Sequence, residues 1–388
     1  MSGNTIEDRR QTRPALSLIL CSRNDSYMGN SRWRLETTLN YIGDQVASLG
    51  RSDAVEILVT DWGSDVPLQQ VLPLHPAAAR IVSFLWIPPD IARRLQKDSL
   101  FPEVLALNAA ARRAKGEYIG RIDQDTLVGR RALEVFFDLY GGDRCLEVPL
   151  NRALLYSNRR GISFHFAARC PAYRHVAEYV RRFGQRCRLD RLEDMRDREF
   201  WTYAVGIWLI HRDLWFDCGG YDERYIHYNW MEVEMITRLR QKYPLIDFGK
   251  IVDHDFYHLG HNNPRVRVAR QETGQQVNSF DLHSATSSLP YHPNIDAWGL
   301  AELKLSFDPS RETSRPARRW FDRLALAALV ADMTLQSLLT KAYLPTLKYK
   351  RRVRVVWTAL RGEPLPRWPR VLEELWMKWS DQQKRSEL

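Results

Sequence analysis

Two aspartates separated by one residue, Asp123 and Asp125, are the side chains of this chain best suited to hold a divalent cation. They end a short apolar run within residues 116–125 that has the composition of a β-strand. Along an extended chain, residues i and i+2 point to the same side, so both carboxylates can turn toward one ion. Acidic pairs at strand ends are more often solvated loop residues, so the spacing alone indicates only a candidate site.

The elements that must position this pair are visible upstream. Residues 15–21 and 55–60 are compact apolar runs, and polar turns follow them at 22–25 and 61–65. Between them, residues 31–49 carry apolar side chains at helical spacing. Because strand, helix and strand in succession build parallel sheets that bind ligands at the carboxyl ends of their strands, we predict an α/β fold with the aspartates at that edge.

A series of motifs then appears in a fixed order over about residues 14 to 265. The series is Ser22-Arg23-Asn24, residues 61–64, Asn108-Ala109-Ala110 ahead of residues 114–119, Asp123-Gln124-Asp125, residues 219–223, residues 230–234 and residues 257–261. In order and spacing it resembles the family 2 glycosyltransferases. This resemblance implies a GT-A (nucleotide-diphospho-sugar transferase) fold, with a mostly parallel central sheet flanked by helices. It also implies transfer of a sugar from a nucleoside-diphosphate sugar, UDP-sugar above all, to a polysaccharide or lipid-linked glycan.

The resemblance also implies roles for individual residues. Asp125 would hold Mn²⁺ or Mg²⁺, Asp123 would position it, and His258 would complete the coordination or contact the diphosphate, with His254 and His261 as alternatives. Nucleotide-sugar binding would involve Ser22, Arg23, Asp61, Asn108 and Arg112 together with Asp123. The acceptor or donor-sugar side would include Gly219, Gly220, Tyr221 and Trp230, the two glycines through backbone geometry. We expect Asp125→Ala to abolish transfer and to leave the fold intact, because the sequence pattern assigns this residue no core packing.

A catalytic base is expected at the start of an acidic helix. In the resembled family the base is the second of two adjacent acidic residues, which corresponds to Glu232 here, whereas Met231 replaces the first. Glu234 is the alternative base, since residues two apart on a helix face different directions and only one of them can reach the acceptor. Both could also be exposed carboxylates favoured at a helix start by the helix dipole.

Composition agrees with a globular enzyme. The chain has 388 residues, 44% of them hydrophobic, with thirteen Trp, enough to bury one large core. We recognise neither a signal peptide nor a membrane-spanning segment, and so expect a cytoplasmic protein. Five cysteines without paired C-x-x-C spacing favour reduced thiols.

The positive charge is concentrated near the end of the chain. Residues 316–388 contain fifteen Lys and Arg against seven Asp and Glu, a net +8 of the chain's +10, interleaved with Trp and Leu. This combination favours an amphipathic helical tail that binds an anionic membrane surface, so we predict peripheral attachment at the cytoplasmic face. The alternative is a solvated helical appendage packed on the enzyme. No recognisable nucleic-acid-binding motif is present, so no nucleic acid is expected.

Four regions follow from these patterns. We predict a disordered arm at 1–13, a glycosyltransferase domain at 14–305 with a nucleotide-binding half (14–127) and an acceptor-side half (128–305), a linker at 306–315 and the basic tail at 316–388. Residues 151–200 are strongly charged and are interpreted as an acceptor-facing insertion or, equally, as a charged surface excursion without a ligand.

Competing functions are a sugar nucleotidyltransferase and a catalytically inactive basic protein that binds membranes or nucleic acid. The first should have a Gly-rich basic phosphate loop after the first strand, and Ser22-Arg23-Asn24-Asp25 is not that loop. A phosphatase of the haloacid dehalogenase type is also disfavoured, because Leu127 follows the aspartates where Thr or Val is needed.

Overall fold

The computed structural model describes residues 13–27, 29–189, 207–227, 230–261, 294 and 297–310, with residues 327, 328 and 331. The chain divides into two units, of which the first comprises residues 1–260 and 275–317, and the fold below is that of this unit. The predicted arm lies outside the described residues up to residue 12, and so does almost all of the predicted basic tail. The predicted domain boundaries therefore stay predictions. Within the described part of the chain, no helix combines the length and the apolar character that crossing a bilayer requires.

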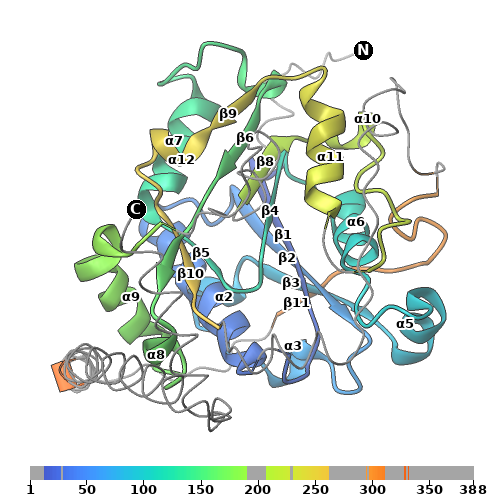
Figure 1. The fold of residues 1–388 in the computed structure, drawn as a ribbon, viewed down its shortest axis with the longest axis horizontal. Coiled ribbons are helices and arrows are strands. Elements are labelled where there is room, and N and C mark those ends of the chain that lie inside the picture. Colours follow the sequence, from blue (N-terminus) through green and yellow to red (C-terminus); the bar gives the residue numbers. More distant parts are fainter. Residues whose placement is uncertain are drawn as a thin grey trace, which may run out of the picture. The chain divides into compact units, whose positions relative to one another are not determined.

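An eight-stranded sheet forms the centre of the fold (Figure 1). Its order is β11 (Asp308–Pro309), β3 (Val82–Ile87), β2 (Val55–Trp62), β1 (Leu16–Ser22), β4 (Tyr118–Ile122), β8 (Ile207–His211), β6 (Leu154–Ser157) and β9 (Leu245–Asp247). Strands β3, β2, β1 and β4 run parallel, whereas β8 is antiparallel to both of its neighbours. Strand β11, which falls in the predicted linker 306–315, pairs antiparallel with β3.

Helices flank this sheet (Figure 1). The longer ones are α2 (Ser31–Ser48), α5 (Pro89–Gln96), α6 (Glu103–Arg113), α7 (Arg130–Gly141), α9 (Tyr173–Phe183) and α11 (Met231–Arg240). Short helical turns are α3 (Leu68–Val71), α4 (Pro76–Ala79), η1 (Leu150–Arg152), α8 (Phe164–Ala167), η2 (Gly184–Arg186), α10 (Arg212–Asp217) and α12 (Phe248–Ile251). The predicted α/β class is confirmed, as are the first two strands, the helix between them and the helix that begins at Met231.

The order of the strands determines where a ligand can bind. The chain runs from β1 outward through β2 and β3, then returns to place β4 on the other side of β1. Such a reversal opens a crevice outside the carboxyl ends of the two adjacent strands, the usual ligand site of open α/β sheets. Ser22 at the end of β1 and Asp123 just after β4 both lie at this reversal.

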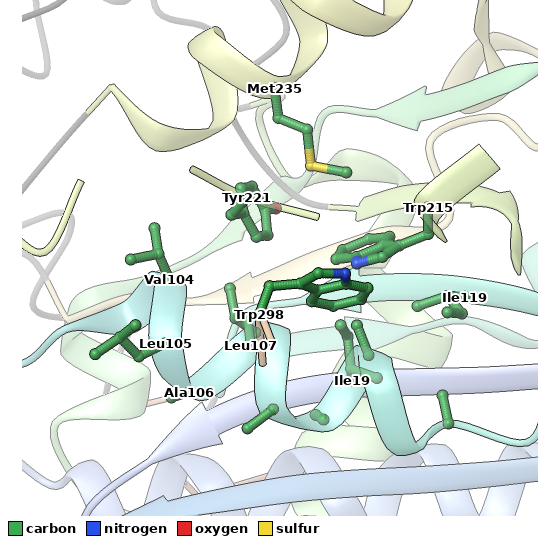
Figure 2. Close-up of a cluster of buried hydrophobic side chains, with 14 of the residues drawn as sticks. Ile19, Val104, Leu105, Ala106, Leu107, Ile119, Trp215, Tyr221, Met235 and Trp298 are labelled. Atoms are coloured by element: carbon green, nitrogen blue, oxygen red, sulfur yellow. The ribbon is translucent and has the colours of Figure 1, made fainter. Parts of the chain in front are cut away.

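One face of the sheet packs on an alanine-rich helix. Helix α6 buries Ala106, Ala109, Ala110 and Ala111, whose small side chains let its backbone approach the sheet, and Thr60 Oγ1 donates to the Ala106 carbonyl at 2.8 Å. Large side chains from α10, α11 and later segments complete this core, among them Trp215, Tyr221, Met235 and Trp298 (Figure 2). The helix is thereby fixed against the segment that follows α10.

A second sheet of three strands joins distant parts of the chain. Strand β10 (Phe256–Leu259) pairs antiparallel with β5 (Thr126–Val128) and parallel with β7 (Arg160–Ile162). In this register His258 lies opposite Thr126, one residue after Asp125. Strand β10 thus carries this histidine to the aspartate pair.

Candidate functional site

Asp123 and Asp125 lie in the turn between β4 and β5, at the reversal of strand order. The Thr126 amide donates to the Asp123 carbonyl at 3.0 Å, which closes the turn. Ser22 Oγ, at the end of β1, donates to Oε1 of Gln124 at 2.5 Å. This contact ties the two carboxyl ends together, so the first polar motif of the chain and the aspartate pair form one site.

Two arginines hold Asp125 in a buried position. Its Oδ2 accepts from Arg34 Nη1 of α2 at 2.7 Å, and both side chains are almost fully buried. Arg159 Nη1 lies 3.3 Å from Asp125 Oδ1 and 2.8 Å from Asp123 Oδ2, and it donates to Thr126 Oγ1 at 2.6 Å. Because removal of one partner leaves the other charge buried and uncompensated, these pairs are structurally important. The premise of the expected Asp125→Ala phenotype is therefore wrong, since the residue is packed and ion-paired rather than free of the core.

A third arginine gathers three carboxylates around the same turn. Arg121 of β4 is 3% exposed. Its Nη2 lies 2.7 Å from Glu103 Oε1, 2.7 Å from Asp123 Oδ1 and 2.9 Å from Glu232 Oε1. Burial raises the pKa of Glu103 to about 7 and raises the pKa of Glu232, against the opposing effect of Arg121. Arg121 thus links the first turn of α6, the aspartate pair and the first turn of α11.

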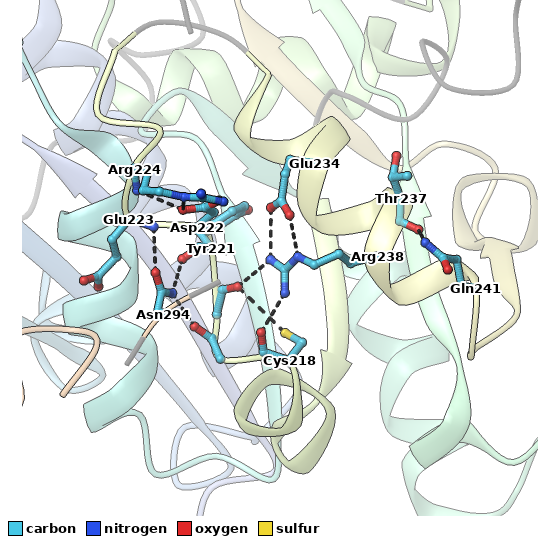
Figure 3. Close-up of polar contacts among 12 residues, drawn as sticks. Cys218, Tyr221, Asp222, Glu223, Arg224, Glu234, Thr237, Arg238, Gln241 and Asn294 are labelled. Atoms are coloured by element: carbon cyan, nitrogen blue, oxygen red, sulfur yellow. Dashed lines mark hydrogen bonds and ion pairs between the residues drawn. The ribbon is translucent and has the colours of Figure 1, made fainter. Parts of the chain in front are cut away.

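Glu232 and Glu234 have different surroundings. Glu232 faces Arg121 and borders a small pocket with otherwise mostly apolar walls, lined by Leu154, Trp208, Ile210, Tyr221, Met235, Ile236 and Leu239. Glu234 forms a buried pair with Arg238, with Nε to Oε1 at 2.5 Å and Nη2 to Oε2 at 3.0 Å (Figure 3). Arg238 also donates to the carbonyls of Cys218 and Gly220 at 2.6 and 2.8 Å. The geometry brings Glu232, and not Glu234, to the aspartates; the catalytic role of either stays a prediction.

Histidines approach Asp125 from β10 and the residues after it. His258 Nε2 lies 3.6 Å from Asp125 Oδ1. One ligand atom from each of Asp125, His258 and His261 lies within 4.8 Å of those of the other two. A carboxylate oxygen with imidazole nitrogens is a donor set that a transition ion such as Mn²⁺ accepts more readily than Mg²⁺ does. His254 is not part of this group, and its amide donates to the Gly249 carbonyl at 2.6 Å.

Of the residues predicted to bind the nucleotide, Ser22 and Arg23 lie beside the aspartate turn, whereas Asp61 and Asn108 are bound within the fold. Ser22 contacts the aspartate turn, and Arg23 pairs with Asp25 at 2.8 Å beside it. Asp61 is fully buried and accepts from the Leu68 amide at 2.7 Å and from Ser64 Oγ; burial raises its pKa to about 6. Asn108 bonds both backbone groups of Tyr221, and the Arg112 guanidinium lies 5.0 Å from the Trp298 ring centroid. Asp61 and Asn108 therefore already have partners within the fold.

The segment after α10 is shaped by its glycines. Gly219 and Gly220 have φ of 69° and 71°, and a Cβ at Gly220 would lie 2.5 Å from Asn108 Oδ1. These backbone conformations favour glycine, and the Asn108 side chain leaves no room for a Cβ at Gly220. Tyr221 is buried edge-on against Trp215, and Trp230 precedes α11 with φ of 73°. A sugar-side role for these four residues stays a prediction.

The sequence patterns did not place Arg34, Arg121 or Glu103 in the site, and Arg159 fell only within the charged residues 151–200. The spacing of Arg121 two residues before Asp123 was the available signal, because an arginine inside an apolar strand needs carboxylates around it. From the sequence pattern, Arg34 and Glu103 cannot be distinguished from exposed residues on a helix surface. Only the tertiary structure brings them to the aspartates.

Comparisons with known proteins support no closer assignment from sequence: no family model and no curated protein matches this chain. Solved structures are similar at low identity. Staphylococcus aureus TarS matches with a TM-score of 0.40 at 11% identity over 60% of this chain and 35% of that chain. TarS 1–349 in complex with UDP matches with a TM-score of 0.38 at 12% identity, over 60% of this chain and 57% of that one. The catalytic domain of Drosophila β1,4-galactosyltransferase 7 with xylobiose has a TM-score of 0.35 at 13% identity, over 70% and 79%.

The matched region of this chain thus spans about a third of the full TarS chain.

Proposed function

We propose that this protein is an inverting, metal-dependent glycosyltransferase of the GT-A type, related to family 2, that uses a nucleoside-diphosphate sugar. One observation carries the proposal. The aspartate pair lies in the crevice where the strand order reverses, with an imidazole 3.6 Å from Asp125 and a half-buried glutamate, Glu232, in the same ion-pair cluster. In one place, the aspartates and the histidine could bind a cation, the arginines could bind phosphate groups and the glutamate could accept a proton.

The donor side is supported by the charges around the turn. Departure of a nucleoside diphosphate builds negative charge on the leaving oxygen, and a bound Mn²⁺ or Mg²⁺ would neutralise it. Asp125 and His258 would hold that ion, and of the two ions this donor set favours Mn²⁺. Arg159, which contacts both aspartates, has the planar donor fork that binds phosphate oxygens in two-point contacts. We expect it to move toward the diphosphate when the cation binds Asp125.

The acceptor side is supported by the position of Glu232. The acceptor hydroxyl bonds to the anomeric carbon from the face opposite the diphosphate while the bond to the diphosphate breaks, and this displacement inverts the anomeric centre. A carboxylate on that face would accept the proton that the hydroxyl loses. Glu232 sits at the start of α11 with Arg121 fixing its orientation at 2.9 Å. Arg121 is then a positioning residue, since it contacts the base and Asp123 together.

Membrane attachment through residues 316–388 is proposed from charge alone, because nearly all of these residues lie outside the described part of the chain. Their net +8 and interleaved Trp and Leu support binding to an anionic surface that weakens as salt is added. The acceptor would then be a polysaccharide or a lipid-linked glycan at that surface.

A thermal-shift screen tests the function. UDP-N-acetylglucosamine, UDP-galactose and other nucleotide sugars are added to the full chain with and without Mn²⁺. A ligand at a hundred times its Kd stabilises the folded state by ~2.7 kcal/mol, so a cognate donor raises Tm in the presence of Mn²⁺.

Asp125→Asn is the variant of choice, because it keeps the size of the side chain beside Arg34. We expect it to abolish the Mn²⁺-dependent shift and to lower transfer by roughly 10³-fold, given the several kcal/mol that metal ions contribute to such transition states. Asp53→Asn, at a fully exposed aspartate, is the matched control and should behave as wild type. Donor binding that needs no metal, or that survives in the Asp125 variant, would contradict the metal assignment; no response to any donor and no sugar transfer would contradict the function.

A further inference from the structure

Residues 151–189 carry an unusual charge. They contain nine arginines, no lysine, no aspartate and one glutamate, a net +8 in 39 residues. The remainder of the chain outside this segment and the tail has more acidic than basic residues, since the tail alone has +8 and the whole chain only +10. The segment is therefore the most basic part of the described structure.

This basic segment is joined to the candidate site by backbone pairing. Strand β7 begins at Arg160 and pairs with β10, so that His258 lies opposite Gly161. The loop at 184–189 packs in turn on β7: the Gly161 amide donates to the Arg188 carbonyl at 2.7 Å, and Arg160 Nη1 donates to the Cys187 carbonyl at 3.1 Å. The segment thus continues outward from the site through β10 and β7.

The charges of this segment are mostly exposed. Arg159 is buried against the aspartates, whereas six arginines are exposed to solvent: Arg152, Arg169, Arg181, Arg182, Arg186 and Arg188. Glu178 of α9, the one acidic residue among residues 151–189, pairs with Arg181 at 2.6 Å and with Arg182 at 2.5 Å. We use the name basic face for these six exposed arginines, which come from η1 (Arg152), the turn after α8 (Arg169), α9 (Arg181 and Arg182) and the loop at 184–189 (Arg186 and Arg188).

We propose that the basic face binds the acceptor and that the acceptor is an anionic polymer bearing phosphate or carboxylate groups. The proposal rests on the transferase function proposed above and names its acceptor class. Guanidinium groups form two-point contacts with both kinds of oxyanion, which lysines cannot do, so a segment whose cations are all arginine is suited to these groups. A polymer bound there would extend to the aspartate turn along β7 and β10.

An anionic membrane and a nucleic acid fit this face less well. Membrane binding by a surface helix needs apolar side chains that enter the lipid, and single-stranded nucleic acid needs aromatic side chains on which bases stack. The exposed large hydrophobic residues of the described structure are Tyr27, Val66, Trp86 and Leu100, none of which lies in the basic segment. Among the described residues, the basic segment therefore has exposed arginines but no large apolar side chain of comparable exposure; Tyr179 and Phe183 of α9 are half-buried and pack on each other.

The test is direct binding, with no donor present, of the full chain to polyphosphate, polygalacturonate and neutral dextran at several salt concentrations. Two double variants remove part of the face, Arg181→Ala with Arg182→Ala and Arg186→Ala with Arg188→Ala. We expect each pair to weaken binding of one or both polyanions roughly tenfold, to reduce its salt dependence, and to leave dextran unbound. Polyphosphate and polygalacturonate distinguish a phosphate-bearing from a carboxylate-bearing acceptor.

The matched control is Arg93→Ala with Arg94→Ala. This pair also ends a helix, α5, is also exposed, and lies on the opposite side of the view from α9 (Figure 1). Because the control also removes two positive charges, comparison with it separates binding at the basic face from an effect of net charge or of the basic tail. Equal weakening by the control pair overturns the proposal, and so does unchanged polyanion binding in both face variants. Tighter binding to anionic vesicles or to single-stranded RNA than to either polymer, lost in the face variants, also overturns it.

Failure of this proposal is distinguishable from failure of the transferase function. Binding is measured without a donor, whereas the function depends on the Mn²⁺-dependent donor shift and on sugar transfer. A protein that passes the donor test but binds polyanions equally with and without the basic face is a transferase for a neutral acceptor. One that binds polyanions through the face and responds to no donor is a polyanion-binding protein without the proposed chemistry.

Discussion

Two groups of buried or half-buried polar side chains lie near the candidate site, and they differ in which groups compensate them. Asp61 and Asn108 bond mainly to backbone groups, of Leu68 and of Tyr221. Asp123, Asp125 and Glu232 are instead compensated by arginine side chains. A backbone partner cannot leave without breaking the fold, whereas an arginine side chain can exchange one anion for another. The first group is therefore structural. The second can respond to a ligand through Arg159 and Arg121, whereas Arg34, which also donates to the Tyr27 carbonyl at 2.6 Å, holds Asp125 in place.

Glu232 and Glu234 lie within one turn of α11 and differ in the same way. Glu234 is tied through Arg238 to the carbonyls of residues 218 and 220, so it belongs with the structural group. Glu232 shares Arg121 with Asp123 and belongs with the exchangeable group.

The largest expected effect is on turnover in Glu232→Gln. The substitution preserves size but removes the proton acceptor, so we expect turnover to fall by roughly 10²–10⁴-fold. Donor binding and stability should change little, because Arg121 keeps Glu103 and Asp123 as partners. Sugar transfer, donor-induced thermal shift and urea unfolding are measured on the same preparation. If Glu234→Gln loses more turnover than Glu232→Gln while both are folded, the assignment of the base is reversed.

The next effect is on stability in Glu234→Gln. Breaking a buried ion pair leaves an uncompensated charge, here Arg238, at a cost of ~3 kcal/mol in the free energy of unfolding. The matched control is Glu178→Gln, because Glu178 pairs with Arg182 at the same i, i+4 spacing and the same 2.5 Å on a more exposed helix surface. Exposed pairs contribute less than ~1 kcal/mol. Equal losses in urea unfolding by the two variants would refute the structural role of Glu234.

Patterns of neighbouring residues were sufficient to predict the strands and helices that position the site, but not the ion-pair partners of the aspartates. The strand ending at Ser22 and the helix over residues 31–48 follow from apolar periodicity and turn residues, which are properties of neighbouring residues. The carboxyl edge was predictable too, because consecutive parallel strands place their ends together.

The partners of the aspartates were not predictable in the same way. Arg34 and Asp125 are 91 residues apart, and Arg121 and Glu232 are joined only when α11 packs beside β4. Arg34 lies in a helix whose other residues mix polar and apolar types, so its burial has no local signal. Asp61 shows the converse: its place at a strand end was predicted, but its fully buried, backbone-bound state depends on residues 64 and 68 folding back over it.

The smallest predicted effect concerns the cost of burying a carboxylate whose partners are a hydroxyl and a backbone amide. Burial raises the pKa of Asp61 to about 6, compared with about 3.9 in an unfolded chain. The folded state therefore takes up this proton first as pH falls, and the contribution of Asp61 to stability rises as pH falls through 6 and levels off below about 4. Between pH 7 and pH 5 the gain in the free energy of unfolding is ~1 kcal/mol.

The variant Asp61→Asn has no carboxylate to protonate and so lacks this gain. The free energy of unfolding of wild type minus that of the variant should therefore increase by that amount as pH falls from 7 to 5, measured in urea titrations at pH 7, 6 and 5. Asp53→Asn, the same substitution at an exposed position, is measured at the same pH values as the matched control. A constant difference across these pH values, or one that shrinks as pH falls, would show that the buried charge of Asp61 is compensated as well as those of the arginine-bound aspartates.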